Sequence, residues 1–127
     1  MIPASTTKLR PGDVCFIPRD DGNFVPFAFL CTPTGKRSSF YGGILNVVVR
    51  HPNVSEIPPH VEVKKYALVH ISCFKENNTH IVGNAAVNIG APVLAAIQRD
   101  TADFSVGATS SVWGYKTIIK YAAAVTA

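Results

Sequence analysis

The sequence predicts a single, mainly β domain over residues 1–127, an antiparallel barrel or sandwich of roughly six to eight strands with at most one short helix. Apolar residues recur mostly with a period of two, as they do in strands that bury one face. Short clusters of Gly, Pro, Asp and Asn separate these stretches, as turns between strands do. A chain of 127 residues also has the length of one ordinary domain.

Two of the expected strands form a hairpin near the start of the chain. They cover residues 14–18 and 23–31, and Arg19–Asn23 joins them with an Asp-Gly pair that suits a tight turn. Pro26 cannot donate a ladder hydrogen bond, so the second strand is expected to lie at an edge or to be interrupted there. Further strands are predicted at residues 40–50, 61–74, 80–87 and 112–121.

The middle strands carry signs of curvature. A Gly42-Gly43 pair interrupts residues 40–50 and suggests a kink where the sheet curls. The alternation in residues 61–74 shifts after Lys65, which predicts a bulge or bend there. The proline-bounded loop at residues 52–59 cannot continue a ladder.

The last third of the chain is less uniform. Residues 112–121 place aromatic and aliphatic side chains at odd positions and lysines at two even positions, which predicts a strand with one packed and one wet face. Residues 92–99 fit a two-turn helix that begins at Pro92 and an extended segment about equally well.

The composition excludes several classes of protein. With 47% hydrophobic and 16% charged residues the chain is not intrinsically disordered. Residues 77–98 lack charged side chains, but polar residues, Gly and Pro interrupt them, so no membrane-spanning helix is expected. The start of the chain has no apolar signal core, which predicts a cytoplasmic protein. The net charge of +4 is dispersed and by itself indicates nucleic-acid binding only weakly.

No catalytic or metal-binding constellation is predicted, and therefore neither enzymatic activity nor a cofactor. Cys15, Cys31 and Cys73 lie in apolar stretches and are expected to be reduced, buried thiols. His70 and His80 would approach across a hairpin and supply half of a metal site, but no carboxylate or thiol stands at a spacing that completes it.

A thiol hydrolase that uses Cys15 is a weaker alternative. Pro11-Gly12-Asp13 is similar to the turn of cell-wall peptidases of the NlpC/P60 kind. In that family the nucleophilic cysteine precedes this turn, and no cysteine precedes it here. The three residues are better explained as a turn that starts the first strand.

Three short stretches near the start resemble the opening of the immunity protein twenty-six family of bacterial polymorphic-toxin systems: Gly12–Pro18, Asp21–Phe24 and Phe27–Leu30. Residues 39–41 and 79–87 are also similar to segments of that family, although His80 stands near the place where its members usually have tryptophan. The resemblance implies a small β-rich immunity protein that binds and neutralises a cognate antibacterial toxin, in a contact-dependent or polymorphic toxin system, without chemistry of its own.

Six residues in turns that are expected to be exposed are candidate contacts with the toxin: Arg19, Asp20, Asp21, Lys36, Arg37 and Tyr41. An inhibitor that occludes a basic nuclease would be acidic, whereas this chain is basic. Either the toxin is not a basic nuclease, or the contact lies away from its catalytic groove, or a local acidic patch is hidden by the average. In this interpretation the partner is the C-terminal domain of a toxin, and the chain contacts neither a membrane nor nucleic acid.

A small nucleic-acid-binding β-barrel is the main alternative. Aromatic residues that could stack on bases accompany lysines in the sequence: Phe40, Tyr41, Trp113, Tyr115 and Tyr121 beside Lys36, Lys116 and Lys120. The strand predicted at residues 112–121 argues against it, because its aromatic residues and lysines would lie on opposite faces. A structural or capsid-associated β domain is a third alternative, suggested by composition alone.

Overall fold

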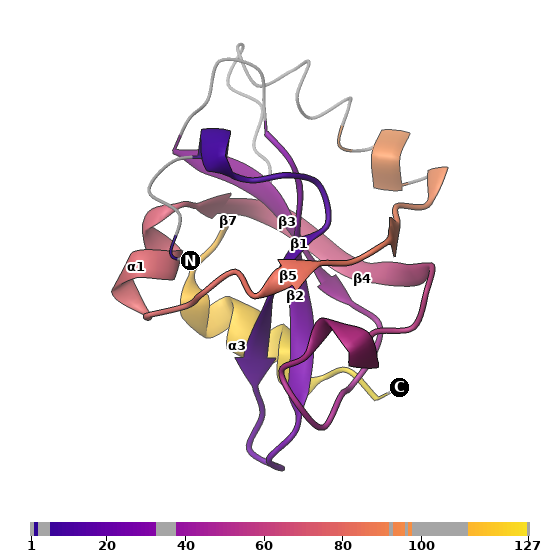
Figure 1. The fold of residues 1–127 in the computed structure, drawn as a ribbon. Coiled ribbons are helices and arrows are strands. Elements are labelled where there is room, and N and C mark those ends of the chain that lie inside the picture. Colours follow the sequence, from indigo (N-terminus) through magenta and orange to yellow (C-terminus); the bar gives the residue numbers. More distant parts are fainter. Residues whose placement is uncertain are drawn as a thin grey trace.

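The computed structural model of the protein describes residue 2 and residues 6–32, 38–91, 93–95, 97 and 112–126. The predicted fold class is confirmed, because the described chain is mainly a mixed β-sheet curled into a half-barrel (Figure 1). The strand order is β5-β1-β2-β3-β4-β6, and β7 also pairs with β4. The strands are β1 (Asp13–Pro18), β2 (Phe24–Cys31), β3 (Ser39–Leu45), β4 (Val61–His70), β5 (Gly83–Asn84), β6 (Val87–Asn88) and β7 (Val112–Trp113).

Helical segments flank the sheet. They are α1 (Ser72–Glu76), α3 (Tyr115–Ala123) and two 3₁₀ turns at Thr6–Lys8 and Val54–Glu56. Residues 91, 93–95 and 97 are helical as well, which favours the helical alternative for this part of the chain. None of the described helices combines the length and the apolar character needed to cross a membrane.

Strands β1 to β4 form an antiparallel meander whose first hairpin agrees with the sequence. Arg19 N–H donates to the carbonyl of Asn23 at 2.9 Å, and Gly22 has a positive φ of 84°, the conformation that its Asp-Gly turn requires. The register between β1 and β2 runs from Val14 opposite Ala28 to Pro18 opposite Phe24.

The prediction that β2 is an edge strand or is broken at Pro26 was wrong, because β2 is an unbroken strand between β1 and β3. Phe24 exchanges backbone hydrogen bonds of 2.8 Å with Val49, and the ladder with β3 begins only at Phe27. The N–H groups of residues two apart in a strand point to the same side, so an N–H at Pro26 would point to the side on which Phe24 bonds to Val49. Pro26 therefore lacks its N–H in the gap between the contact with Val49 and the start of the ladder with β3.

The predicted irregularity near Lys65 is confirmed as a bulge. Ile44 lies opposite Lys65 and Leu45 opposite Val63, which leaves Lys64 as the extra residue on β4. Because a bulge bends the strand that carries it, the sheet curls at this point.

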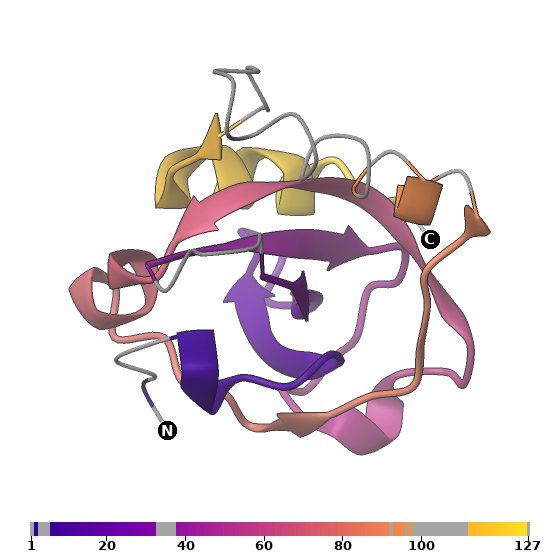
Figure 2. The ribbon, with the colours of Figure 1, turned by 90° about the horizontal axis from the view of Figure 1, so that it is seen from above.

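One short segment contacts both outer strands of the sheet. Strand β5 pairs with β1 in antiparallel orientation, and β6 pairs with β4 in parallel orientation, although only Ala85 and Ala86 separate them in the chain. Seen from above, the strands and this segment therefore trace a ring (Figure 2).

The sheet is buried on both faces, which explains why β2 and β3 are apolar at nearly every position. One cluster of buried side chains faces the segment of β5 and β6 and includes Val14, Leu30, Tyr41, Leu45 and Ala85. The other lies beneath α1 and α3 and includes Cys15, Phe27, Phe40, Phe74 and Ile118. The Phe40 ring stacks on that of Phe74 with a centroid distance of 5.4 Å.

The strand predicted at residues 112–121 is wrong. Only Val112–Trp113 are extended, and the chain from Tyr115 onward is α3. Its buried residues Ile118 and Ala122, followed by Val125, recur at the spacing of a helix, so α3 packs on the sheet through this stripe.

Three further strand predictions were too long. The strand predicted over residues 40–50 ends at Leu45, and in the rest of that range only Val49 makes an isolated bridge, to Phe24. The strand predicted over residues 61–74 ends at His70, because the chain turns into α1. The one predicted over residues 80–87 contributes only β5 and the first residue of β6.

Candidate binding grooves

Two of the three charged candidates in the first hairpin, Arg19 and Asp21, make contacts that hold the fold together. The Arg19 guanidinium donates from Nη1 to the carbonyls of Ala122 and Val125 at 3.1 and 2.6 Å, and from Nη2 to Asp21 at 3.0 Å. Asp21 also accepts a hydrogen bond of 3.0 Å from Asn23 N–H, which lowers the pKa of its carboxyl group. Asp20 is exposed in the same turn.

Tyr41 was expected in an exposed turn, and this placement was wrong. Its side chain is completely buried within β3, because β3 is covered on both faces. Lys36 and Arg37 lie outside the residues that the structure describes.

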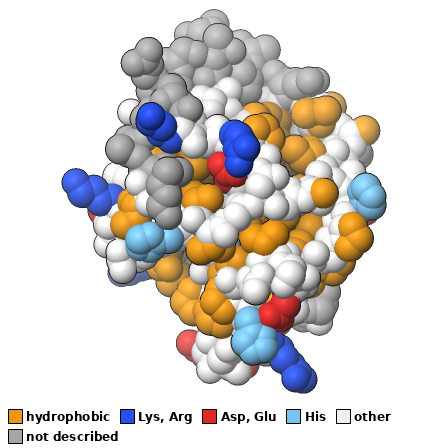
Figure 3. All heavy atoms as spheres, viewed as in Figure 1, with side chains coloured by type: hydrophobic (Ala, Val, Ile, Leu, Met, Phe, Trp, Pro, Cys, Tyr) orange, Lys and Arg blue, Asp and Glu red, His pale blue; other side chains and the backbone are white. Residues whose placement is uncertain are grey.

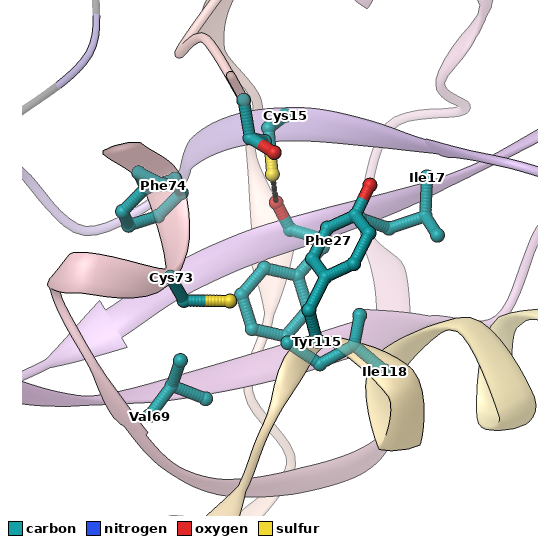
Figure 4. Close-up of a pocket in the computed structure, with 9 residues that line it drawn as sticks. Cys15, Ile17, Phe27, Val69, Cys73, Phe74, Tyr115 and Ile118 are labelled. Atoms are coloured by element: carbon teal, nitrogen blue, oxygen red, sulfur yellow. Dashed lines mark hydrogen bonds between the residues drawn. The ribbon is translucent and has the colours of Figure 1, made fainter. Parts of the chain in front are cut away.

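The cysteines are free thiols, but the expectation that all three are buried was wrong, because Cys15 is buried whereas Cys31 and Cys73 are only half-buried. Cys15 and Cys73 line the same small cavity (Figure 4). The Cys15 thiol donates to the carbonyl of Phe27 at 3.7 Å, and burial raises its pKa to about 12. The cavity between Cys15, Cys73 and Tyr115 has a volume of only about 10 Å³, near the minimum for one water molecule. A thiol this hard to ionise is a poor nucleophile, which argues against the hydrolase alternative.

The two histidines that were considered as half of a metal site are placed apart from any ligand set. His70 Nδ1 lies 2.7 Å from the hydroxyl of Ser72 and accepts from the Ser72 N–H at 3.1 Å, so the ring nitrogen is already engaged by the first residue of α1. Within the described ranges, no group of three His, Cys, Asp or Glu residues is arranged to hold a metal ion.

A groove of about 320 Å³ with a mixed apolar and polar lining lies beside the first hairpin. We call this the hairpin groove, and it is lined by Phe16, Pro18, Phe24, Pro52, Asn77, Asn78, Thr79, His80, Val82 and Tyr115. Aromatic and aliphatic groups supply most of its wall, and none of its lining residues is Lys, Arg, Asp or Glu. Figure 3 views the molecule from the side of β5, where hydrophobic side chains gather and charged ones lie mostly around the edge.

The wall opposite the hairpin is shaped by the turn after α1. Asn78 adopts a positive φ of 50°, which asparagine tolerates better than most residues, and Thr79 N–H donates to the Phe74 carbonyl at 2.8 Å. Val82 N–H then donates to the Val14 carbonyl at 3.0 Å, which fixes residues 79–82 alongside β1. The Val82 side chain remains 50% exposed at this site.

A second groove, of about 330 Å³, is basic and aromatic. We call it the lysine groove, and it is lined by Lys64, Lys65, Tyr66, Val93, Trp113 and Tyr121. The Lys65 ammonium lies 4.5 Å from the centroid of the Tyr121 ring, and that of Lys120 lies 5.8 Å from it. Trp113 packs against the same ring with a centroid distance of 5.1 Å.

Comparison of the chain with models of protein families, with curated proteins and with solved structures found no match.

Neither groove was predicted from the sequence, although the sequence contains a pattern related to each of them. The Asp-Gly turn fixes a hairpin register in which Pro18 faces Phe24 and Phe16 faces Pro26, so the aromatic floor of the hairpin groove could have been found. The lysine groove depends on α3 being a helix, and the strand assigned to residues 112–121 concealed it.

Proposed function

We propose that this chain is an immunity protein, which binds the C-terminal domain of a cognate antibacterial toxin in the hairpin groove and neutralises it as a protein–protein complex. One spatial relation carries the proposal. The two stretches that most resemble the immunity protein twenty-six family, residues 12–30 and 79–87, are far apart in the sequence but pair as β1 and β5. They also supply six of the ten residues that line the hairpin groove: Phe16, Pro18, Phe24, Thr79, His80 and Val82.

The chemistry of this groove suits a protein partner. Tight interfaces have an apolar, often aromatic centre and a polar rim, and a few central residues supply most of the binding energy. Phe16, Phe24 and Tyr115 provide such a centre, and the side chains of Asn77 and Asn78 provide polar groups beside it. A sheet that is packed on both faces also holds these residues in a fixed arrangement, which limits the entropy lost on binding.

The proposal is tested by co-expressing the chain with a candidate toxin domain, taken from a neighbouring gene that encodes a large secreted protein with a variable C-terminal domain. We expect rescued growth and a stable 1:1 complex in size-exclusion chromatography. Val82→Asp places a charge in the groove on a half-exposed side chain, and we expect it to weaken the complex at least tenfold in a titration.

Ile119→Asp is the matched control. Ile119 is also an exposed aliphatic residue, 38% exposed, but it lies on α3 and does not line the hairpin groove. We expect this variant to bind as the wild type does. A toxin complex that tolerates Val82→Asp as well as Ile119→Asp would exclude the hairpin groove, and failure to bind or rescue at all would refute the immunity function.

A further inference from the structure

We propose that the lysine groove is a binding site for single-stranded nucleic acid, separate from the hairpin groove and independent of the immunity function. The groove combines the two components that such sites use, namely cations for the phosphates and aromatic rings for the bases. Half of its lining residues are aromatic and two are lysines, and no carboxylate lines it.

The helix α3 brings these components together. In a strand, Lys120 and Tyr121 would point to opposite faces, and the aromatic residues could not share a surface with the lysines. In α3 the Lys120 ammonium instead lies 5.8 Å from the Tyr121 ring. β7 pairs with β4 at Leu68 and Val69, and Trp113 of β7 lines the groove together with Lys65 of β4 and Tyr121 of α3.

The three cations are Lys64, Lys65 and Lys120, all with exposed side chains. The ammonium groups of Lys65 and Lys120 both lie near the half-buried ring of Tyr121. A nucleotide joins a flat base to an anionic phosphate, so a base that stacks on Tyr121 takes the place of the Lys65 ammonium over the ring and brings its phosphate within reach of both lysines. Trp113, which is 7% exposed, supports the ring from the protein side and is itself too buried to stack on a base.

In Figure 2, α3 and the helical turn near residue 93 lie on the same side of β4. Val93 from this turn and Tyr121 from α3 form two walls, and Lys64–Tyr66 of β4 form the floor. An acidic peptide would satisfy the cations, but it would leave the aromatic walls without a flat partner, so we favour the nucleic acid.

The test is fluorescence anisotropy of the whole chain with a labelled 20-nucleotide oligo(dT) and, separately, oligo(U). Neutralising three phosphates of a single strand predicts a slope of about −2 in a plot of log K against log salt concentration, hence about twentyfold weaker binding at 200 mM than at 50 mM salt. Lys65→Gln should reduce the steepness of this slope by about 0.7. Tyr121→Leu should weaken binding about tenfold or more, and Tyr121→Phe, which keeps the ring, should bind normally.

Lys75→Gln is the control, because it removes one exposed positive charge on α1, outside the groove. Thermal melts establish that each variant is folded at the assay temperature. Three results would each overturn the proposal: no binding at 50 mM salt, an equal loss of affinity in Lys75→Gln and Lys65→Gln, or displacement of the oligonucleotide by poly-glutamate at equal charge concentration. The last result would assign the groove to acidic peptides. None of these measurements involves the toxin, so their outcome does not depend on whether the immunity function is correct.

Discussion

Replacing Arg19 with alanine should destabilise the protein, because this side chain joins the first hairpin to the end of α3. The guanidinium donates to the carbonyl of Ala122 in the last turn of α3, which also accepts from Val125 N–H, and to the carbonyl of Val125 just beyond the helix. A hydrogen bond from a charged donor contributes about 1.5–3 kcal/mol, and the side chain is only 17% exposed. Taking the lower value for both bonds, we expect a loss of about 3 kcal/mol.

For a chain of 127 residues this loss corresponds to a fall in Tm of about 10 °C. Urea unfolding followed by circular dichroism measures the free energy directly. Asp20→Ala is the control, since Asp20 is an exposed neighbour in the same turn and its loss should change stability by less than about 0.5 kcal/mol. If Arg19→Ala unfolded at the same urea concentration as Asp20→Ala, the structural role assigned to Arg19 would be wrong.

Three further substitutions or treatments probe other parts of the structure. Gly42→Ala should lower the free energy of unfolding in urea by about 1–3 kcal/mol, because the new Cβ would lie 2.3 Å from Cζ of the buried Phe27 ring. A variant as stable as the wild-type protein would contradict this packing. Burial raises the pKa of Cys15 to about 12, so its thiol should not react with iodoacetamide at pH 8 until urea unfolds the chain. Peptide mass spectrometry measures this labelling, and rapid labelling of the native protein would contradict the burial of Cys15. Hydrogen bonding from Asn23 N–H lowers the pKa of Asp21 below 3.8. The wild-type protein should therefore be more stable to unfolding than Asp21→Asn above about pH 4, and this difference in stability should shrink as the pH falls further. A stability difference that does not vary with pH would refute this linkage.

The first part of the fold could be predicted from the sequence because local signals there agree with the tertiary structure. The Asp-Gly pair favours the turn that Gly22 adopts with its positive φ, and the shift in alternation near Lys65 marks a real bulge. The prediction at Pro26 was wrong because the cost of a missing N–H depends on whether a neighbouring strand would have accepted a hydrogen bond at that position. That information lies in the contact between Phe24 and Val49, which is distant in sequence.

Residues 112–121 show why periodicity alone could not settle the C-terminal part. Trp113, Tyr115, Ile119 and Tyr121 satisfy a period of two, yet the residues that α3 buries are Ile118 and Ala122. Two periods are therefore superimposed in one short segment, and the choice between them depends on the surface that receives it. The sheet offers an apolar face, and the Arg19 guanidinium binds the last carbonyls of a helix there, so the helix is the more stable of the two.

Whether residues 112–121 form a strand or a helix also determines whether aromatic rings and lysines share one surface. As a strand, residues 112–121 would bury their aromatic rings and leave lysines alone on the surface, an arrangement that nucleic-acid stacking does not use. As a helix that follows β7, the same residues place the Tyr121 ring near two ammonium groups, at 4.5 Å from that of Lys65 and 5.8 Å from that of Lys120. Part of the hairpin groove requires no such reinterpretation, because Phe16 and Phe24 lie on a hairpin that the turn already specifies, whereas its residue Tyr115 also depends on α3. Helix α3 contributes to both grooves, but no residue lines both of them, so variants of one groove should leave the ligand proposed for the other groove bound.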